Sequence, residues 1–387
     1  MKYIVVVGDG MGDEPLEELG GRTPLEYAET PNMDTIAREG ACGLMKTVPE
    51  GFEPGSDIAN LCILGYNPGR YHTGRGPLEA ASMGIELAEG DIAYRCNLVT
   101  VEDGLMIDFT SGHISGDEGA RLISALSKAA GDTVSLYPGV SYRNLLVVHH
   151  GEGAETTPPH DIVGEPVAPH LPRGGDSPLL RALMERSAGV FSNHPVNQAR
   201  RGAGRRPATM IWPWGGGRRP ALPSFMERYG ISGGMISAVD LLRGIGRLAG
   251  MEVIDVPGAT GFLDTDYQAK AEYALRAIDR HDFVYVHVEA PDEASHMGSI
   301  REKVRAIERI DEMLGTIASG FGGVIAVLTD HCTPIRLKTH SSDPVPFAVR
   351  GVWRDGCRGF SERAANRGAL GLISALDFLP MMFRESG

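Results

Sequence analysis

Three short apolar segments, each soon followed by an acidic residue, constrain the fold of this chain more than any other feature. They span residues 3–7, 283–288 and 324–328 and are rich in β-branched side chains. Uninterrupted apolar runs of this length predict strands that are buried on both faces, as in a parallel sheet covered by helices. Because ligands of such sheets collect at the carboxyl ends of the strands, the acidic residues predict a binding site at that edge.

Helical patterns alternate with these strands. Thr30 and Pro31 open a predicted helix that Gly40 ends. Further helices are predicted at residues 238–249 and 267–279. From 299 to 318, apolar residues recur three or four positions apart, which indicates an amphipathic helix. The alternation predicts an α/β core with a mostly parallel sheet.

Residues 73–207 have a different pattern. Shorter strands are predicted at 93–101, 105–109 and 144–149, with a helix at 117–130 and a proline-rich loop at 158–178. This mixed α+β stretch predicts an inserted cap domain, residues 73–207, in a core formed by residues 1–72 and 208–387.

Two segments near the predicted boundary have competing interpretations. Residues 198–206 are basic and broken by glycines, which predicts a solvated loop, with a hinge or a phosphate contact as alternatives. The string Trp212-Pro213-Trp214, followed by glycines, predicts aromatic packing at a domain junction rather than a ligand site.

Composition limits the classes of partner. The net charge of -13 argues against nucleic acid and anionic membranes but leaves a small anionic substrate open. The five cysteines are dispersed without a CxxC pair, which predicts reduced thiols and a cytoplasmic protein. No apolar run approaches the ~18 residues of a membrane span, and the apolar start is too short for a signal peptide.

Side chains that bind metals gather at the predicted strand and loop ends: Asp9, Ser56, Asp292, His296, Asp330, His331 and His340. Asp292 and His296 lie four apart on one helical turn, so both can reach one cation. Adjacent Asp330 and His331 point to opposite sides and would serve two metals or two edges of one site. Carboxylates, imidazoles and a hydroxyl suit a pair of divalent ions such as Mn²⁺, Zn²⁺ or Mg²⁺.

Each of these residues also has an ordinary structural interpretation. Asp9 could close a turn or cap a helix, Ser56 could cap the helix that follows it, and Cys332 fits a small buried residue better than a soft ligand. Their joint occurrence favours a two-metal site with Ser56 as nucleophile beside a helix N-terminus. Two metals would lower the pKa of the serine and stabilise a transferring phosphoryl group. The chain contains no GxxxxGK[ST], GxSxG or HExxH motif.

These motifs, in this order, resemble those of the archaeal-type, 2,3-bisphosphoglycerate-independent phosphoglycerate mutases of the alkaline phosphatase superfamily. The resemblance covers nearly the whole chain and rests on Val7-Gly8-Asp9-Gly10-Met11, Gly55-Ser56-Asp57, Asp292-x-x-x-His296-x-Gly298, Thr329-Asp330-His331 and the later His340, supported by Thr30-Pro31-Asn32-Met33-Asp34, Thr73-Gly74-Arg75-Gly76-Pro77-Leu78-Glu79-Ala80 and Val288-Glu289-Ala290-Pro291-Asp292. It implies an alkaline-phosphatase-like, three-layer α/β/α core with the inserted α+β cap.

The resemblance also implies the role of each residue. One metal would be held by Asp292, His296 and His340, and the other by Asp9, Ser56, Asp330 and His331. The expected metal is Mn²⁺, with Zn²⁺, Mg²⁺ or Co²⁺ as alternatives and no 2,3-bisphosphoglycerate. Ser56 would take the phosphoryl group of 3-phosphoglycerate and return it to the 2-hydroxyl, a step of glycolysis and gluconeogenesis.

The cap would contact the substrate. The string Ser111-Gly112-His113-Ile114-Ser115 resembles the family's histidine segment, so His113 is a candidate, with Arg143 and Arg75 as candidate arginines. A bidentate arginine suits either the phosphate or the carboxylate of a phosphoglycerate. The alternative for His113 and Arg143 is an ordinary surface or core-lining polar role.

Other functions remain open from the sequence. The segment from Gln198 through Trp214 resembles a bacterial branch proposed to act as homoserine kinases, and that chemistry would also pass through Ser56. A metal-dependent phosphatase is a third hypothesis. A non-catalytic binding protein would leave the complete ligand set unexplained. The mutase hypothesis further requires a cap that closes and excludes water while glycerate reorients.

Overall fold

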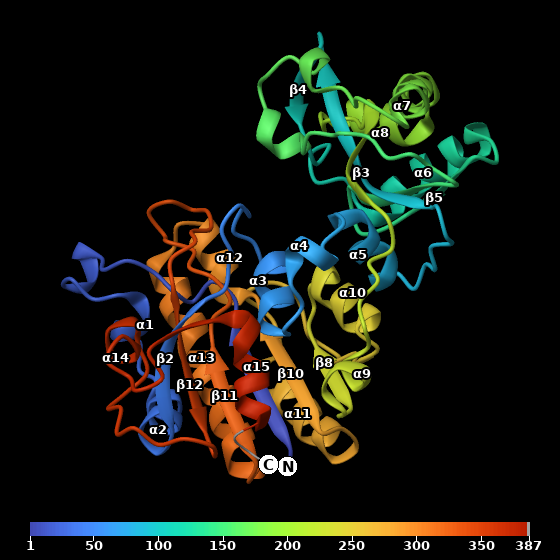
Figure 1. The fold of residues 1–387 in the computed structure, drawn as a ribbon. Helices are drawn as coiled ribbons and strands as arrows, with labels where there is room; N and C mark the ends of the chain where they lie inside the picture. The colour runs from blue at the N-terminus through green and yellow to red at the C-terminus, as the bar shows by residue number, and fades with distance from the viewer. Residues whose placement is uncertain (385–387) are drawn as a thin grey trace. The chain divides into compact units, whose positions relative to one another are not determined.

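The computed structural model describes residues 1–384, which form two compact units (Figure 1). The first unit contains residues 1–72 and 222–384, and the second is the insertion Thr73–Ala221. The second unit thus ends later than the predicted residue 207. The reason is that β7 (Met210–Gly217) pairs with β3 (Ile92–Glu102) inside the insertion. The two-tryptophan segment is therefore a strand of that unit's sheet, and the prediction of junction packing is wrong.

The first unit is built on an eight-stranded sheet. Its strands, in order across the sheet, are β13 (Leu372–Ser374), β2 (Ala41–Lys46), β12 (Val345–Arg350), β11 (Val324–Leu328), β1 (Tyr3–Gly8), β10 (Phe283–Val288), β8 (Gly233–Ile236) and β9 (Glu252–Val253). Neighbours are parallel throughout except at β12, which runs antiparallel to both β11 and β2. The predicted mostly parallel sheet is confirmed.

The central strands β1, β10 and β11 are buried along their whole length, as their apolar sequences require. Their register aligns their carboxyl ends, because Val7 pairs with His287 on one side and with Leu328 on the other. The chain leaves all three strands at the same edge of the sheet. This shared edge is where the predicted metal ligands follow.

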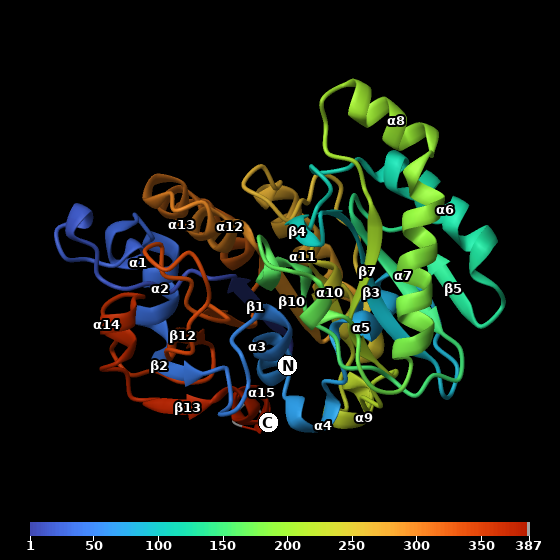
Figure 2. The ribbon, with the colours of Figure 1, turned by 90° about the horizontal axis from the view of Figure 1, so that it is seen from above.

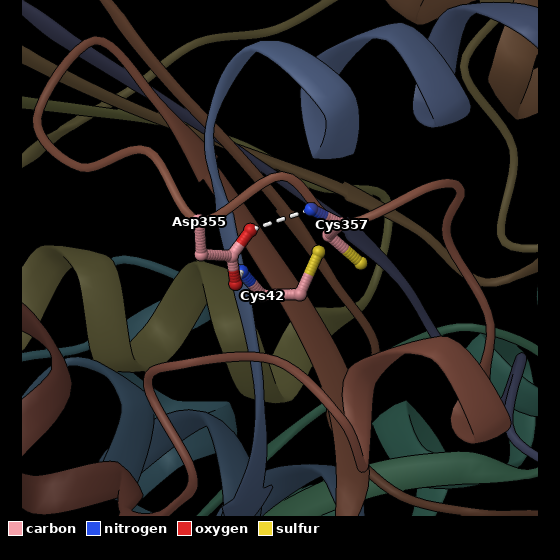
Figure 3. Close-up of side chains that lie close together, drawn as sticks. All are labelled: Cys42, Asp355 and Cys357. Carbon is pink, nitrogen blue, oxygen red and sulfur yellow. Dashed lines mark hydrogen bonds between the residues drawn. The ribbon is translucent and has the colours of Figure 1, made fainter.

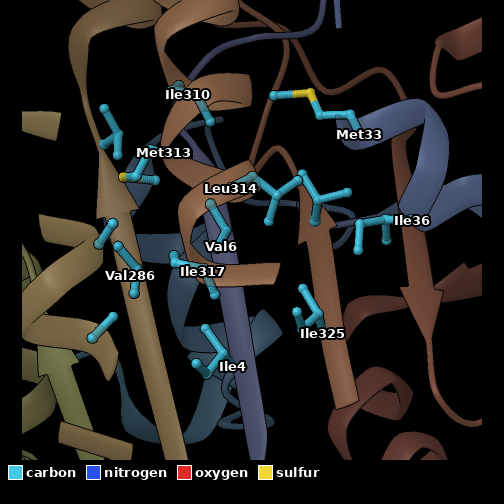
Figure 4. Close-up of a cluster of buried hydrophobic side chains, with 14 of the residues drawn as sticks. Ile4, Val6, Met33, Ile36, Val286, Ile310, Met313, Leu314, Ile317 and Ile325 are labelled. Carbon is cyan, nitrogen blue, oxygen red and sulfur yellow. The ribbon is translucent and has the colours of Figure 1, made fainter. Parts of the chain in front are cut away.

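Helices cover both faces of this sheet. On one face lie α2 (Pro31–Glu39), α11 (Tyr267–Arg280) and α13 (Ile300–Gly320), and on the other α3 (Ser56–Ile63), α10 (Asp240–Leu248) and α15 (Ala375–Arg384). Figure 4 shows Ile4 and Val6 of β1 facing Leu314 and Ile317 of the amphipathic α13. The first unit is a three-layer α/β/α structure, as expected.

Shorter helices and turns complete the first unit. They are α1 (Pro24–Tyr27), α4 (Pro68–Tyr71), α9 (Phe225–Tyr229), α12 (Ala290–His296) and α14 (Glu362–Ala365), together with the 3₁₀ turn Glu17–Leu19. In the described part of the chain, no helix has the length and apolarity that crossing a bilayer requires.

The second unit has an antiparallel five-stranded sheet (Figure 2). The long β3 pairs with β7 along one edge and with β4 (Leu105–Asp108) and β6 (Arg143–Val148) along the other, and β5 (Val134–Tyr137) follows β6. Its helices are α5 (Arg75–Ser82), α6 (Gly116–Ala130), α7 (Ser177–Ser192) and α8 (Pro195–Gly202), and its 3₁₀ turns are Pro159–Ile162 and Ala168–His170. Helices α6 and α7 pack on one face, and α5 packs on the other.

Candidate functional site

The first predicted group of metal ligands is assembled on α12, directly after β10. Pro291 stands in the first turn of this helix, which its fixed φ favours. Asp292 Oδ2 lies 3.0 Å from His296 Nε2, four residues later on the same turn. His340, from a distant loop, places its Nε2 3.2 Å from His296 Nε2 and 3.5 Å from Asp292 Oδ1. The structure therefore brings these three residues together.

The second group lies where β1 and β11 end. Ser56 is the first residue of α3, and its Oγ is 3.4 Å from Asp9 Oδ2 and 3.1 Å from His331 Nε2. His331 Nε2 is in turn 3.2 Å from Asp9 Oδ1 and 3.7 Å from Asp330 Oδ2. Asp9 and His331 therefore contact the serine hydroxyl, and Asp330 lies beside His331.

The two groups form one centre. Thr333 Oγ1 donates a 2.6 Å hydrogen bond to Asp292 Oδ1 and lies 3.2 Å from His331 Nδ1. The rings of His331 and His340 have centroids only 4.2 Å apart. His331 thus stands between the groups, with ligand atoms of Asp292, His331 and His340 all within 4.8 Å of one another.

The imidazoles are oriented for metal binding. His296 Nδ1 lies 2.9 Å from the Lys338 carbonyl, and His340 Nδ1 lies 3.3 Å from the Pro54 carbonyl. A hydrogen on Nδ1 satisfies each of these contacts and leaves the Nε2 lone pair facing the centre. His331 follows the same arrangement, because Thr333 gives its own hydrogen to Asp292 and can accept one from Nδ1.

Buried carboxylates give the centre its electrostatics. Burial raises the pKa of Asp9 well above its ordinary value, and the nearby charges of Asp330 and Asp292 raise it further. Burial opposes charge on Asp330 as well, but His331 and His287 outweigh it and lower the pKa of that carboxyl. A hydrogen bond to the Asp292 carboxylate raises the pKa of His296 to about 9. Closely spaced buried acids are unfavourable until a cation neutralises them.

The residues present fit divalent metal ions. Among the described residues, the buried Asp9 Oδ1 and both ring nitrogens of the buried His287 have no hydrogen-bond partner. Buried polar atoms are almost always satisfied, so these unsatisfied atoms, which lie beside acids and imidazoles, are donors that a cation would satisfy. Oxygen and imidazole donors are those that Mn²⁺, Zn²⁺ and Mg²⁺ accept. His287 was missed from the sequence because it lies inside an apolar strand run.

Asn60, beside the predicted nucleophile Ser56, was also missed. Its Nδ2 donates to the Ser56 carbonyl and to Asp330 Oδ2, both at 2.8 Å. Tyr285 donates from its hydroxyl to Asn60 Oδ1 at 2.5 Å. Asn60 thus joins the first turn of α3 to Asp330, a predicted ligand, and Tyr285 holds the amide of Asn60 in place. The available signal was the spacing, since residues 56 and 60 share one helix face.

Lys303 is a further buried group beneath the centre. Its Nζ donates to the carbonyls of Gly12 (3.1 Å) and Thr333 (3.0 Å) and to Asp13 Oδ2 (2.8 Å). It therefore joins the loop that follows Asp9 to the loop that carries Thr333. The sequence contained a signal, because this lysine interrupts the apolar stripe of the helix predicted at 299–318.

A second cluster of potential ligands has a structural role (Figure 3). It consists of Cys42, Asp355 and Cys357. Asp355 Oδ2 accepts from the backbone N–H groups of Cys42 (3.0 Å) and Ala369 (2.9 Å), and Oδ1 accepts from that of Cys357 (2.8 Å). Three backbone donors already occupy this carboxylate, so the cluster stabilises the loops around β2. Cys332 is buried, as the structural interpretation of that residue expected.

The inserted unit contains a group of arginines around Trp214. The guanidinium of Arg95 lies 4.6 Å over the Trp214 ring, and its Nε is 2.9 Å from Glu79 Oε1. Arg75 lies 6.0 Å over the same ring. Burial lowers the pKa of Arg95, and the positive charges of Arg75 and Arg143 lower it further, although Glu79 opposes them. Guanidinium groups suit the phosphate or the carboxylate of an anion, so these arginines remain candidates for contact with the substrate.

His113 lies in an unusual loop of the same unit. It is exposed, and residues Ser111, Gly112 and His113 have φ values of 51°, 62° and 48°. Non-glycine residues rarely adopt this left-handed conformation, and it costs of order 1–3 kcal/mol each. Arg200, only 1% exposed, donates to the carbonyls of Ser111 (2.5 Å) and Gly112 (3.2 Å).

The basic segment 198–206 therefore holds the His113 loop in place. Its first half is in α8, where Arg200 Nη1 also lies 2.6 Å from Glu118 Oε2. Arg206 forms an ion pair of 2.9 Å with Asp108, whose other oxygen accepts from Thr110. The prediction of a solvated loop is confirmed for residues 203–206, which are exposed and not helical, and is wrong for residues 198–202, which lie in α8 with Arg200 buried.

An α/β/α core with a serine hydroxyl, carboxylates and imidazoles at its strand ends is typical of metal-dependent enzymes that transfer phosphoryl groups. Comparison with known proteins gives the particular family. A family model described as 2,3-bisphosphoglycerate-independent phosphoglycerate mutase matches residues 37–197. A mutase of that name from Methanothrix thermoacetophila is 52% identical, with 99% of both chains covered. Another, from Methanothermobacter thermautotrophicus, is 53% identical over 99% of this chain and 97% of that protein.

Solved structures agree. A cofactor-independent phosphoglycerate mutase from Thermoplasma acidophilum has a TM-score of 0.70 at 31% identity, with 100% of both chains covered. A Pyrococcus horikoshii protein has a TM-score of 0.88 at 31% identity, covering 100% of this chain and 97% of that one. The chain belongs to the 2,3-bisphosphoglycerate-independent phosphoglycerate mutases.

Proposed function

We propose that this chain interconverts 3-phosphoglycerate and 2-phosphoglycerate through a phosphoserine at Ser56, without 2,3-bisphosphoglycerate. The observation that carries the proposal is the position of the Ser56 hydroxyl, 3.4 Å from Asp9 and 3.1 Å from His331 in a cluster of buried acids and imidazoles. Relatives about half identical to this chain over nearly its whole length are named for that activity.

Two divalent ions would be held by the residues of this cluster. Asp292, His296 and His340 are proposed for one ion, and Asp9, Ser56, Asp330 and His331 for the other. When bound, such ions supply positive charge that lowers the pKa of a serine and stabilises the transferring phosphoryl group. We propose Mn²⁺ as the ion, with Zn²⁺, Mg²⁺ or Co²⁺ as alternatives.

The side chains then perform two symmetrical transfers. Ser56 Oγ loses its proton and forms a bond to phosphorus as the bond from phosphorus to the 3-oxygen of the substrate breaks, and the released 3-oxygen takes up a proton. In the second transfer the 2-oxygen of the same glycerate loses its proton and bonds to phosphorus as the bond from phosphorus to Ser56 Oγ breaks, and Oγ takes up a proton. No water or cofactor is consumed. Asn60 holds the serine and Asp330 in place during both steps.

The arginine group of the inserted unit is proposed to recognise the charges of the substrate. A phosphoglycerate carries a phosphate and a carboxylate, and either group suits a guanidinium. Arg75 and Arg143 are predicted for this role from the sequence, and we propose Arg95 as well, because its guanidinium lies over the same Trp214 ring as that of Arg75. His113 is proposed as a further contact, since the contacts of Arg200 fix the conformation of its loop.

The setting of the reaction is proposed from its substrates and from the cysteines. This substrate pair belongs to glycolysis and gluconeogenesis. The five cysteines are free, which supports a cytoplasmic protein. The segment that resembles homoserine kinases contains the buried Arg200, whose contacts are structural, and most of the core strand β7, so it offers no specific support for a kinase.

Product analysis tests this function. Metal-loaded protein is incubated with 3-phosphoglycerate alone, and 2-phosphoglycerate and inorganic phosphate are both measured. We expect 2-phosphoglycerate as the main product, with activity lost on chelation and restored by metal. Inorganic phosphate as the main product would indicate a phosphatase. ATP-dependent phosphorylation of homoserine, without mutase turnover, would falsify the proposal.

A further inference from the structure

We propose that His287 is a ligand of the metal ion assigned to Asp9, Asp330, His331 and Ser56. This inference rests on the proposed function for the presence of that ion. It adds a residue from the interior of β10 to a set otherwise drawn from strand ends and loops. The ion would then be bound by two imidazoles, two carboxylates and the serine hydroxyl.

The sheet register places His287 beside Asp9. β10 runs parallel to β1, with His287 opposite Val7, so the imidazole stands next to the position where the chain leaves β1. His287 Nε2 is 3.3 Å from Asp9 Oδ2 and 3.8 Å from Asp330 Oδ2. Ligand atoms of the three residues all lie within 4.8 Å of one another, which a single cation can span.

The environment of His287 does not satisfy its imidazole. The side chains of His287, Asp9 and Asp330 are each 0% exposed. Among the described residues, neither ring nitrogen of His287 has a hydrogen-bond partner, and Asp9 Oδ1 has none either. A buried polar group without a partner costs about 1–3 kcal/mol, and β10 offers only apolar residues, Val286 and Val288, on either side. A bound cation removes this cost.

Asp9 lies between two imidazoles. Its Oδ1 faces His331 Nε2 at 3.2 Å, and its Oδ2 faces His287 Nε2 at 3.3 Å. A neutral imidazole with its hydrogen on Nδ1 directs the Nε2 lone pair into the space that these carboxylates surround. The alternative is a hydrogen on Nε2 that is donated to Asp9, which would make His287 a positioning residue. The two arrangements differ in whether His287 Nε2 coordinates the metal ion.

A crystal structure of the wild-type protein loaded with Zn²⁺ tests the inference without any substitution. We expect His287 Nε2 at about 2.1 Å from the ion, the usual zinc–imidazole distance. A zinc ion bound by Asp9 and Asp330 with His287 Nε2 more than about 3 Å away, beyond that bonding distance, would overturn it. The same sample is assayed for mutase turnover, which separates the two proposals. Turnover without zinc on His287 contradicts only this inference, and zinc on His287 without turnover contradicts only the proposed function.

The variant His287→Gln supplies a second measurement, because glutamine can donate an N–H to Asp9 but lacks an imidazole. Loss of an outer hydrogen-bonding partner typically weakens metal binding 10- to 100-fold, so removal of a ligand is expected to exceed about 100-fold. Binding of Co²⁺ is measured by equilibrium dialysis. The visible absorption spectrum of the bound Co²⁺ is also recorded, because it changes when a nitrogen ligand is lost.

The matched control is His281→Gln. His281 precedes the opposite end of the same strand, where its Nε2 lies 2.6 Å from Glu252 Oε2. We expect this variant to bind two ions with the wild-type spectrum. Circular dichroism of both metal-free variants establishes that they fold. A folded His287→Gln variant with unchanged affinity and spectrum would overturn the inference.

Discussion

Thr333 donates a 2.6 Å hydrogen bond from its hydroxyl to Asp292 Oδ1, and so joins the two halves of the proposed metal centre. The hydroxyl oxygen of Thr333 also lies 3.2 Å from His331 Nδ1. One hydroxyl therefore fixes the orientation of a carboxylate proposed for one ion and of an imidazole proposed for the other. Such outer contacts govern both metal affinity and ligand basicity.

The variant Thr333→Val removes this hydroxyl and keeps the shape of the side chain. We expect metal affinity to fall about 10- to 100-fold, as for other outer-shell partners, because Asp292 loses a donor and His331 loses an acceptor. Competition with a chromophoric chelator measures the change. The control is Thr316→Val, whose hydroxyl contacts Gln268 instead. Equal affinities in the two variants would show that Thr333 is unimportant for the centre.

Replacing Lys303 with methionine leaves the Asp13 carboxylate buried without its cation. Breaking one side of a buried ion pair costs about 3–5 kcal/mol, and we expect that loss in the free energy of unfolding measured in urea. Because Lys303 also holds two loops together, activity should fall further than stability alone explains. The double variant Lys303→Met with Asp13→Asn should recover part of the stability. A loss below about 1 kcal/mol, within the range of surface pairs, would contradict this description.

The stability of the metal-free protein should depend on pH through His296. Hydrogen bonding to Asp292 raises the pKa of this imidazole from 6.5 to about 9. Between these values the folded state binds more protons than the unfolded state, so stability is present below pH 6.5 and is lost as pH rises through 9. Metal requires the neutral imidazole, so metal affinity should rise over the same interval.

Urea unfolding of metal-free wild type and His296→Asn at several pH values measures the stability effect. The difference in unfolding free energy between the two proteins should shrink as pH rises from 6.5 to 9. A difference that stays constant across this interval would show that Asp292 does not stabilise the imidazolium.

Arg143→Ala should weaken substrate binding. A hydrogen bond to a charged group contributes about 1.5–3 kcal/mol, so we expect KM for 3-phosphoglycerate to rise about 10- to 100-fold. The control is Arg121→Ala, an exposed arginine on α6 of the same unit. Steady-state kinetics of both variants decide the matter, and equal KM values would remove Arg143 from the substrate site.

Much of the core was predictable from sequence, because its elements depend on local patterns. The apolar runs gave β10 and β11 with their observed bounds, and the spacing of Asp292 and His296 gave the turn of α12. Long-range pairing was not accessible. β7 contains Pro213, which is disfavoured inside a sheet, and only its pairing with β3 makes it a strand.

The site was predictable to a similar degree. Residues at strand ends could be predicted as candidate ligands because parallel strands share an edge, and the structure brings their side chains close together. The supporting residues had weaker signals. The spacing of Asn60 from Ser56 and the place of Lys303 in an apolar stripe are visible in the sequence, but the partners of these side chains lie far away in it. His287 had no signal of its own, because it lies inside an apolar run. The partners of Arg200 in α6 and in the His113 loop lie 82 to 89 residues away.

Trapping the phosphorylated enzyme tests the central claim most directly. Metal-loaded protein is mixed with 3-phosphoglycerate that carries a labelled phosphoryl group, quenched during turnover, digested and analysed by mass spectrometry. We expect the label on the peptide that contains Ser56, no label in Ser56→Ala, and no turnover by that variant. Undiminished conversion to 2-phosphoglycerate by Ser56→Ala, or label confined to another residue, would contradict the account.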